Sequence, residues 1–146
     1  MPSKPAEIYQ GSDWLTYRWS VAQAFDTLDR VRDLCLQMPV AVGGTAGKEP
    51  ARFEAPAEDI ADMFGYVVEL CDDLTGELDI VHADIVPPTQ ANIMQAWIAF
   101  EMRLHLCELR RRALKETEVS MPPPGPPDEI LALASRIKAL LKQIDQ

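Results

Sequence analysis

Prolines divide this chain into segments, and four of these segments carry apolar residues at helical spacing. Proline is costly inside a helix but is tolerated in its first turn, so helices are expected between the proline groups. The twelve prolines fall at positions 2–5, 39, 50–56, 87–88 and 122–127. This placement predicts an all-α protein, an antiparallel four-helix bundle with helices over about 12–38, 57–86, 89–117 and 128–144.

The first two predicted helices each carry a heptad seam, in which apolar residues follow alternating steps of three and four. Gly65 and Gly76 lie within the second helix, and each costs about 1 kcal/mol relative to alanine. We therefore expect a kink or break at Thr75-Gly76. The two seams are Trp14, Tyr17, Val21, Ala24, Leu28, Val31, Cys35 and Met38, and Ile60, Phe64, Val67, Cys71, Leu74, Leu78, Val81 and Ile85.

The third predicted helix is apolar on more sides than a simple bundle requires. This excess predicts either a central helix or a helix in an oligomer contact. Its heptad seam is interrupted by Arg111, whereas a second apolar stripe has no charged member. The seam is Ile93, Trp97, Phe100, Leu104, Cys107 and Leu114, and the second stripe is Met94, Ile98, Met102, Leu106 and Leu109.

The rest of the chain is expected to connect these helices within a single domain, 1–146. We predict an extended N-terminal arm at 1–11, a flexible loop at 39–56 and a Pro-rich linker at 121–127. The linker composition is semi-rigid and extended, so the last helix either folds onto its own bundle or is exchanged between subunits. No segment shows the alternation typical of a hairpin strand. The heptad seam of the last predicted helix, 128–144, is Ile130, Leu133, Ile137, Leu140 and Ile144.

Charge is strongly separated along the sequence. From Phe53 to Met102 there are eleven acidic residues and no lysine or arginine, whereas Arg103, Arg110–Arg112 and Lys115 follow directly. Like charges on one surface raise a field that selects partners. We therefore predict a docking face for a protein partner, and a basic partner would match its charge. The face is formed by Glu58, Asp62, Glu69, Asp72, Asp73 and Glu77.

The overall composition disfavours several classes of function. The net charge of −9 argues against direct nucleic-acid binding and against anionic membrane surfaces. No apolar run reaches the roughly 20 residues of a membrane span, and no signal peptide is visible, so we expect a cytoplasmic protein. Cys35, Cys71 and Cys107 all lie on seams without the short spacings of metal sites, which indicates core residues and no metal.

One short acidic motif suggests an enzyme as an alternative. Glu58-Asp59-Ile60-Ala61-Asp62, followed by Met63 to Val68, resembles the second acidic motif of the MazG-like all-α nucleotide pyrophosphohydrolases. The resemblance implies a first motif near Asp26-Thr27-Leu28-Asp29, where this chain has aspartates and the family uses glutamates. It also implies that Mg²⁺ is held against a nucleoside triphosphate by carboxylates from two helices. The candidate metal ligands are Asp26, Asp29, Asp59 and Asp62.

The favoured prediction is a non-enzymatic helical-bundle interaction protein with an acidic docking face and no cofactor. Such a protein would serve as an adaptor, chaperone or assembly factor, and the apolar surplus on the third helix favours a homodimer. The alternative is a MazG-like Mg²⁺-dependent nucleoside triphosphate pyrophosphohydrolase. The two interpretations differ in whether the carboxylates near Asp26 and Asp62 face one cavity or point to solvent.

Overall fold

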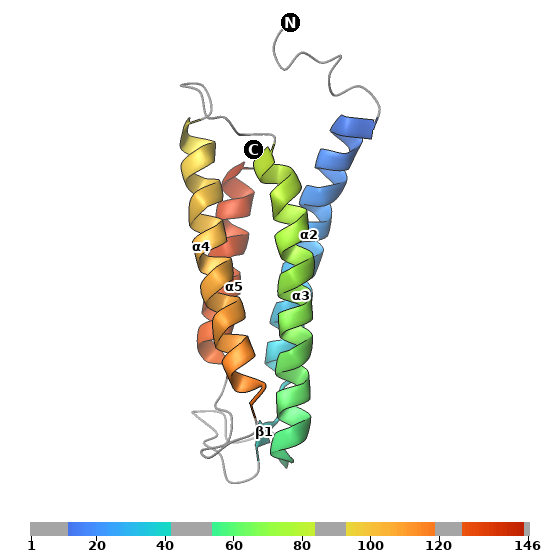
Figure 1. Ribbon diagram of the computed structural model, residues 1–146, viewed down its shortest axis with the longest axis vertical. Helices are drawn as coiled ribbons and strands as arrows, with labels where there is room; N and C mark the ends of the chain where they lie inside the picture. Colours follow the sequence, from blue (N-terminus) through green and yellow to red (C-terminus); the bar gives the residue numbers. More distant parts are fainter. Residues whose placement is uncertain (1–11, 42–53, 84–92, 119–126, 145–146) are drawn as a thin grey trace, which may run out of the picture.

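The computed structural model describes residues 12–41, 54–83, 93–118 and 127–144, with side chains for residues 17–39, 54–82, 93–118 and 127–144. Four helices account for most of these residues, which confirms the all-α prediction (Figure 1). The predicted end of the second helix at 86, the predicted start of the third at 89, and the 1–11 arm lie outside the described residues. The helices are α2 (Ser12–Gln37), α3 (Ala57–Ala83), α4 (Ile93–Glu116) and α5 (Asp128–Ile144).

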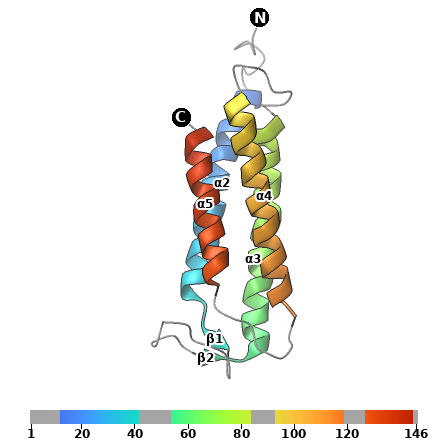
Figure 2. The same ribbon diagram turned by 90° about the vertical axis from the view of Figure 1, so that its left-hand side faces the viewer.

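The four helices form a bundle in which each packs against two neighbours, in the order α2, α3, α4, α5 and back to α2. Successive helices run in opposite directions, as the colour sequence in Figures 1 and 2 shows. For α3 and α4 two ion pairs give the same result, because Asp79 pairs with Arg103 and Asp72 with Arg110. The second pair lies seven residues nearer the N-terminus of α3 and seven residues nearer the C-terminus of α4 than the first pair. The two helices therefore run antiparallel.

The heptad seams of α2 and α3 form half of the core, as the sequence predicts. Every described member of these seams is buried except Tyr17, which packs against the core while partly exposed. Phe64 is the largest fully buried side chain. The last helix packs its apolar stripe on α2 and α4 of its own chain. Exchange of this helix between subunits stays a prediction, because one chain does not test it.

Polar contacts cross each of the four helix–helix boundaries. Between α2 and α3, the Thr27 hydroxyl donates to the Glu77 carboxylate at 2.9 and 3.1 Å. Between α2 and α5, Lys138 Nζ donates to Asp29 Oδ1 at 2.7 Å. Between α3 and α4, Arg103 and Arg110 form ion pairs with aspartates of α3. Between α4 and α5, Arg112 forms an ion pair with Glu129. These contacts define the register of each helix pair.

The segment predicted to be a flexible 39–56 loop begins and ends in backbone pairing. β1 (Val40–Ala41) lies parallel to β2 (Glu54–Ala55), with Val40 level with Glu54 and Ala41 level with Ala55. The sequence predicted no strand, because two residues cannot show an alternating pattern. This short pair brings the chain back to α3, whose first turn begins with Asp59 and Ile60 donating to the Pro56 carbonyl.

The predicted break at Thr75-Gly76 is wrong, because α3 is one helix from Ala57 to Ala83. A kink at this point stays a prediction. A methyl group added at Gly65 or Gly76 would meet no atom within 4 Å. Both glycines therefore destabilise the helix through backbone entropy, although the packing around them leaves room for an alanine. We expect Gly76→Ala to raise the free energy of unfolding by about 1 kcal/mol, measured by urea denaturation. A destabilised variant would show that this position needs glycine.

Candidate functional site

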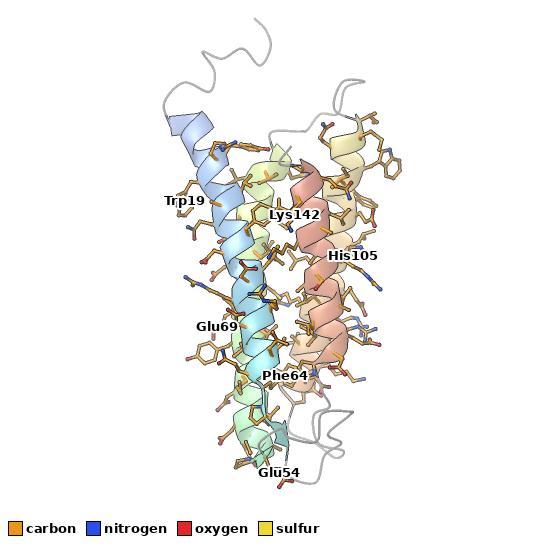
Figure 3. The ribbon with its side chains drawn as sticks, turned by 180° about the vertical axis from the view of Figure 1, so that it is seen from behind. Trp19, Glu54, Phe64, Glu69, His105 and Lys142 are labelled. Atoms are coloured by element: carbon orange, nitrogen blue, oxygen red, sulfur yellow. The ribbon has the colours of Figure 1, made fainter. Side chains whose placement is uncertain are left out.

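The predicted acidic docking face separates into three environments along α3. Glu58, Asp62, Glu69 and Asp73 are exposed on the side of α3 that faces away from the core. No ion pair is formed by these four within the described part of the chain. Figure 3 shows Glu69 on the outside of the bundle. These residues form what we call the outer acidic face.

The other two predicted face residues form polar contacts with neighbouring helices of the same chain. Asp72 accepts a hydrogen bond from Arg110 Nε at 2.8 Å, so its charge is matched by α4. Glu77 faces α2 and is half-buried beside Thr27. Burial raises the pKa of the Glu77 carboxyl, the Thr27 hydrogen bond lowers it, and nearby Asp73 raises it further. Neither residue is available to a partner in the way the outer acidic face is.

The four candidate Mg²⁺ ligands do not come together. Asp26 pairs with Arg30 at 3.0 Å, and Asp29 is held by Lys138, whose hydrogen bond lowers the pKa of that carboxyl. Since Thr27 lies level with Glu77, Asp29 lies level with about residue 75 of α3. Asp62 is about 13 residues away along that helix, which is roughly 20 Å at 1.5 Å per residue. Asp59 lies further still.

Carboxylates this far apart cannot share one metal ion, whose bonds to oxygen are only about 2 Å long. Across the described residues, no group of three or more His, Cys, Asp or Glu side chains is placed to hold a metal. The register of α2 against α3 therefore does not support the hydrolase alternative. The sequence alone does not give this separation, because the separation depends on which residues of α2 and α3 lie side by side.

The structure reverses the two stripes predicted on α4. Of the second stripe, Met102, Leu106 and Leu109 are buried in the core and Ile98 packs against it, whereas Met94 is exposed. Ala99 and Ala113, which belong to neither predicted stripe, are buried with them. The heptad seam points outward, which corrects its assignment as the packing seam. We call this exposed set the outer seam: Ile93, Trp97, Phe100, Leu104, Cys107 and Leu114.

The outer seam is strongly exposed along its length. Its large side chains and the neighbouring Met94 are 43% to 66% exposed, with Trp97 at 62% and Phe100 and Leu104 at 53% each. Trp97 and Phe100 contact each other edge to face, with ring centroids 6.4 Å apart. Apolar side chains gathered along one helix face differ from the scattered apolar residues of ordinary surfaces. This arrangement is typical of a binding surface.

Arg111 offers the signal that could have assigned the stripes correctly. It occupies a seam position, is exposed, and is paired with Glu108 of its own helix at 2.7 Å. Burying a guanidinium without a full set of partners is expensive, so the stripe containing it faces water. The charge-free stripe faces the core. Of the two neighbouring arginines, Arg110 pairs with the acidic helix α3, whereas Arg112 pairs with Glu129 of α5.

The three cysteines also occupy two kinds of environment. Cys35 and Cys71 are buried in the core, where burial raises the pKa of the Cys71 thiol to about 12. Cys107 is exposed on the outer seam, which corrects its predicted core position. It lines a hollow between α3 and α4 together with Leu78 and Leu106. Thr75 and the ion-paired side chains Asp79, Arg103 and Arg110 form the rest of its wall.

Comparison with known proteins gives no assignment. No family model matches the chain, and no curated protein or solved structure is significantly similar to it. The resemblance to MazG-like hydrolases therefore has no support from a family match. Each described helix is too short or too polar to cross a membrane.

Proposed function

We propose that this chain is a non-enzymatic helical-bundle interaction protein that acts as an adaptor, chaperone or assembly factor. The observation that carries the proposal is the outer seam of α4. Its apolar side chains lie outside a bundle whose core is already filled by the opposite face of the same helix. Folding of the described bundle does not require this exposed surface. Such an apolar face is a feature of proteins that bind other proteins.

The outer acidic face supplies the second binding surface in this proposal. Its exposed carboxylates lack a cation from the described chain, whereas Asp72 and Asp79 on the neighbouring side of α3 are matched by arginines. A basic protein partner would provide the missing charge, and complementary charge would speed its association. We place this interaction in the cytoplasm and expect no metal or nucleotide cofactor.

The docking prediction is tested by reversing charge on the outer acidic face. We expect Glu69→Lys/Asp73→Lys to lose at least tenfold in affinity for a partner co-purified from the native host, because two attractions become repulsions. Binding of the unaltered chain should weaken as salt rises, because screening shortens the reach of exposed charges. The affinity is measured by titration calorimetry with the purified partner.

A matched control separates local charge from net charge. Ala132→Lys/Ser135→Lys/Ala139→Lys/Gln143→Lys changes the net charge by the same amount on exposed positions of α5, which packs mainly on α2 and α4 rather than on α3. This control should retain the partner. Equal loss in both variants would indicate a general charge effect and contradict the docking face. Stabilisation of the chain by millimolar Mg²⁺ with a nucleoside triphosphate analogue would favour the hydrolase instead.

A further inference from the structure

We infer that the outer seam of α4 is occupied by the same seam of a second copy, in an antiparallel homodimer. This inference rests on the proposed function and names the occupant of one of its two surfaces. The outer acidic face of α3 remains free for the partner. Three observations carry it: the apolar area of the seam, the distribution of charge along α4, and the hollow beside Cys107.

The seam offers about the area that a stable dimer requires. Fully exposed large apolar side chains present about 200 Å² or more, so the exposed fractions of the seam and Met94 correspond to roughly 700 Å² per copy. Two copies would bury about 1,400 Å², within the range of specific protein–protein interfaces. The three-and-four spacing of the seam is also the pattern by which helices pack along one another.

Charge along α4 favours an antiparallel over a parallel pair. Residues 93–100 carry no charged side chain, whereas Arg103, Arg110, Arg111, Arg112 and Lys115 follow. A parallel, in-register pair would place Arg111 against its own copy and bring both basic halves together. An antiparallel pair places each basic half beside an uncharged half. The flanking Arg103 and Arg110 are already neutralised by Asp79 and Asp72 of their own chain.

The side chains of the seam complement one another about a two-fold axis at the level of Met102. Phe100 then lies opposite Leu104 of the second copy, and Trp97 opposite Cys107. The largest side chain of the seam thus meets the smallest, beside the hollow lined by Leu78 and Leu106. Arg111 lies opposite Ile93, over which its aliphatic stem can extend while its charge reaches water. Each seam position from 93 to 111 therefore has a compatible neighbour, whereas Leu114 lies level with residue 90, beyond the described helix of the second copy.

The decisive experiment compares two exposed tryptophans. At about 100 µM, where an interface of this size is expected to be populated, light scattering should give about twice the 16.3 kDa chain mass. Trp97→Glu should give the monomer mass with unchanged helicity by circular dichroism. Trp19→Glu should remain dimeric, because Trp19 is similarly exposed at 60% but lies on α2, across the bundle from the labelled His105 of α4 (Figure 3).

A monomeric wild-type chain, a dimeric Trp97→Glu variant or a monomeric Trp19→Glu variant would each overturn the inference. Salt gives an independent outcome. Each copy carries a net charge of −9, so screening should preserve or increase the dimer fraction as salt rises. A decrease with salt would contradict an apolar interface. It would also contrast with partner docking, which should weaken with salt, so the two proposals fail in different measurements.

Cys107 reports the direction of the helices in the dimer. In the antiparallel pair the two Cys107 Cα atoms are ten residues apart along the axis, or about 15 Å at 1.5 Å per residue. Two cysteines can form a disulfide only when their Cα atoms are within about 7 Å. Mild oxidation of the dimer should therefore give no disulfide-linked species. Rapid and complete linkage, lost in Cys107→Ser, would indicate a parallel pair and overturn the antiparallel arrangement.

Discussion

Leu109→Ala should lower the free energy of unfolding by about 3 kcal/mol, whereas Leu104→Ala should change it by less than about 0.5 kcal/mol. Both leucines lie on α4, but Leu109 is fully buried and Leu104 is 53% exposed. Truncating the buried leucine removes apolar contacts and leaves a cavity that its neighbours only partly fill. The exposed leucine already contacts water in the single chain.

The two variants are compared by urea denaturation at low micromolar concentration, where loss of dimer contacts does not contribute. Equal m-values would show that both variants unfold the same amount of surface. The pair tests directly which stripe of α4 is the inner one. If Leu104→Ala were the more damaging substitution at low concentration, the heptad seam would be the packing face and the outer seam would not exist.

Phe64→Ala should cost about 3 to 5 kcal/mol, a large fraction of the stability of a domain this size. Phe64 is the largest fully buried side chain and belongs to the seam of α3. Its ring fills space between packed helices, so its removal leaves a large cavity in a close-packed interior. Thermal unfolding followed by circular dichroism should show a large decrease in Tm.

Phe100→Ala is the matched control for this experiment. The same ring is removed, but from a position that is 53% exposed on the outer seam. Its Tm should stay within a few degrees of wild type at low concentration, while the dimer should weaken at high concentration. Similar losses of Tm in both variants at low concentration would mean that Phe100 contributes to the core.

The fold was largely predictable because most helices show a single apolar stripe. For α2 and α3 there is one face that can be buried, so heptad spacing also identifies the core residues. On α5 the seam is buried except for Leu140, and Leu141 beside it is fully buried. On α4 two stripes compete, and periodicity alone does not rank them. The inner stripe carries Ala99 and Ala113, whose small side chains suit the 8–10 Å approach of packed helices. The other stripe carries Arg111 and bulky aromatic rings.

The candidate surfaces were less predictable than the fold. Acidic composition located the charge on α3 but could not separate Asp72 and Glu77, which face neighbouring helices, from Glu69 and Asp73, which face outward. Adjacent side chains on a helix point about 100° apart, so a shift of one residue along the sequence separates a carboxylate that pairs with an arginine from one that faces water. The same limit applies to the proposed Mg²⁺ ligands, because helix register lies beyond local patterns.

The sequence by itself determined that this chain forms four helices, because proline placement and heptad spacing are local properties of the backbone and its side chains. It also determined that acidic and basic residues lie on successive helices. Only the tertiary structure decided which stripe of α4 is buried, which acids are neutralised, and how far apart Asp29 and Asp62 lie. These outcomes depend on contacts between segments distant in the chain, where burial and charge pairing are optimised together.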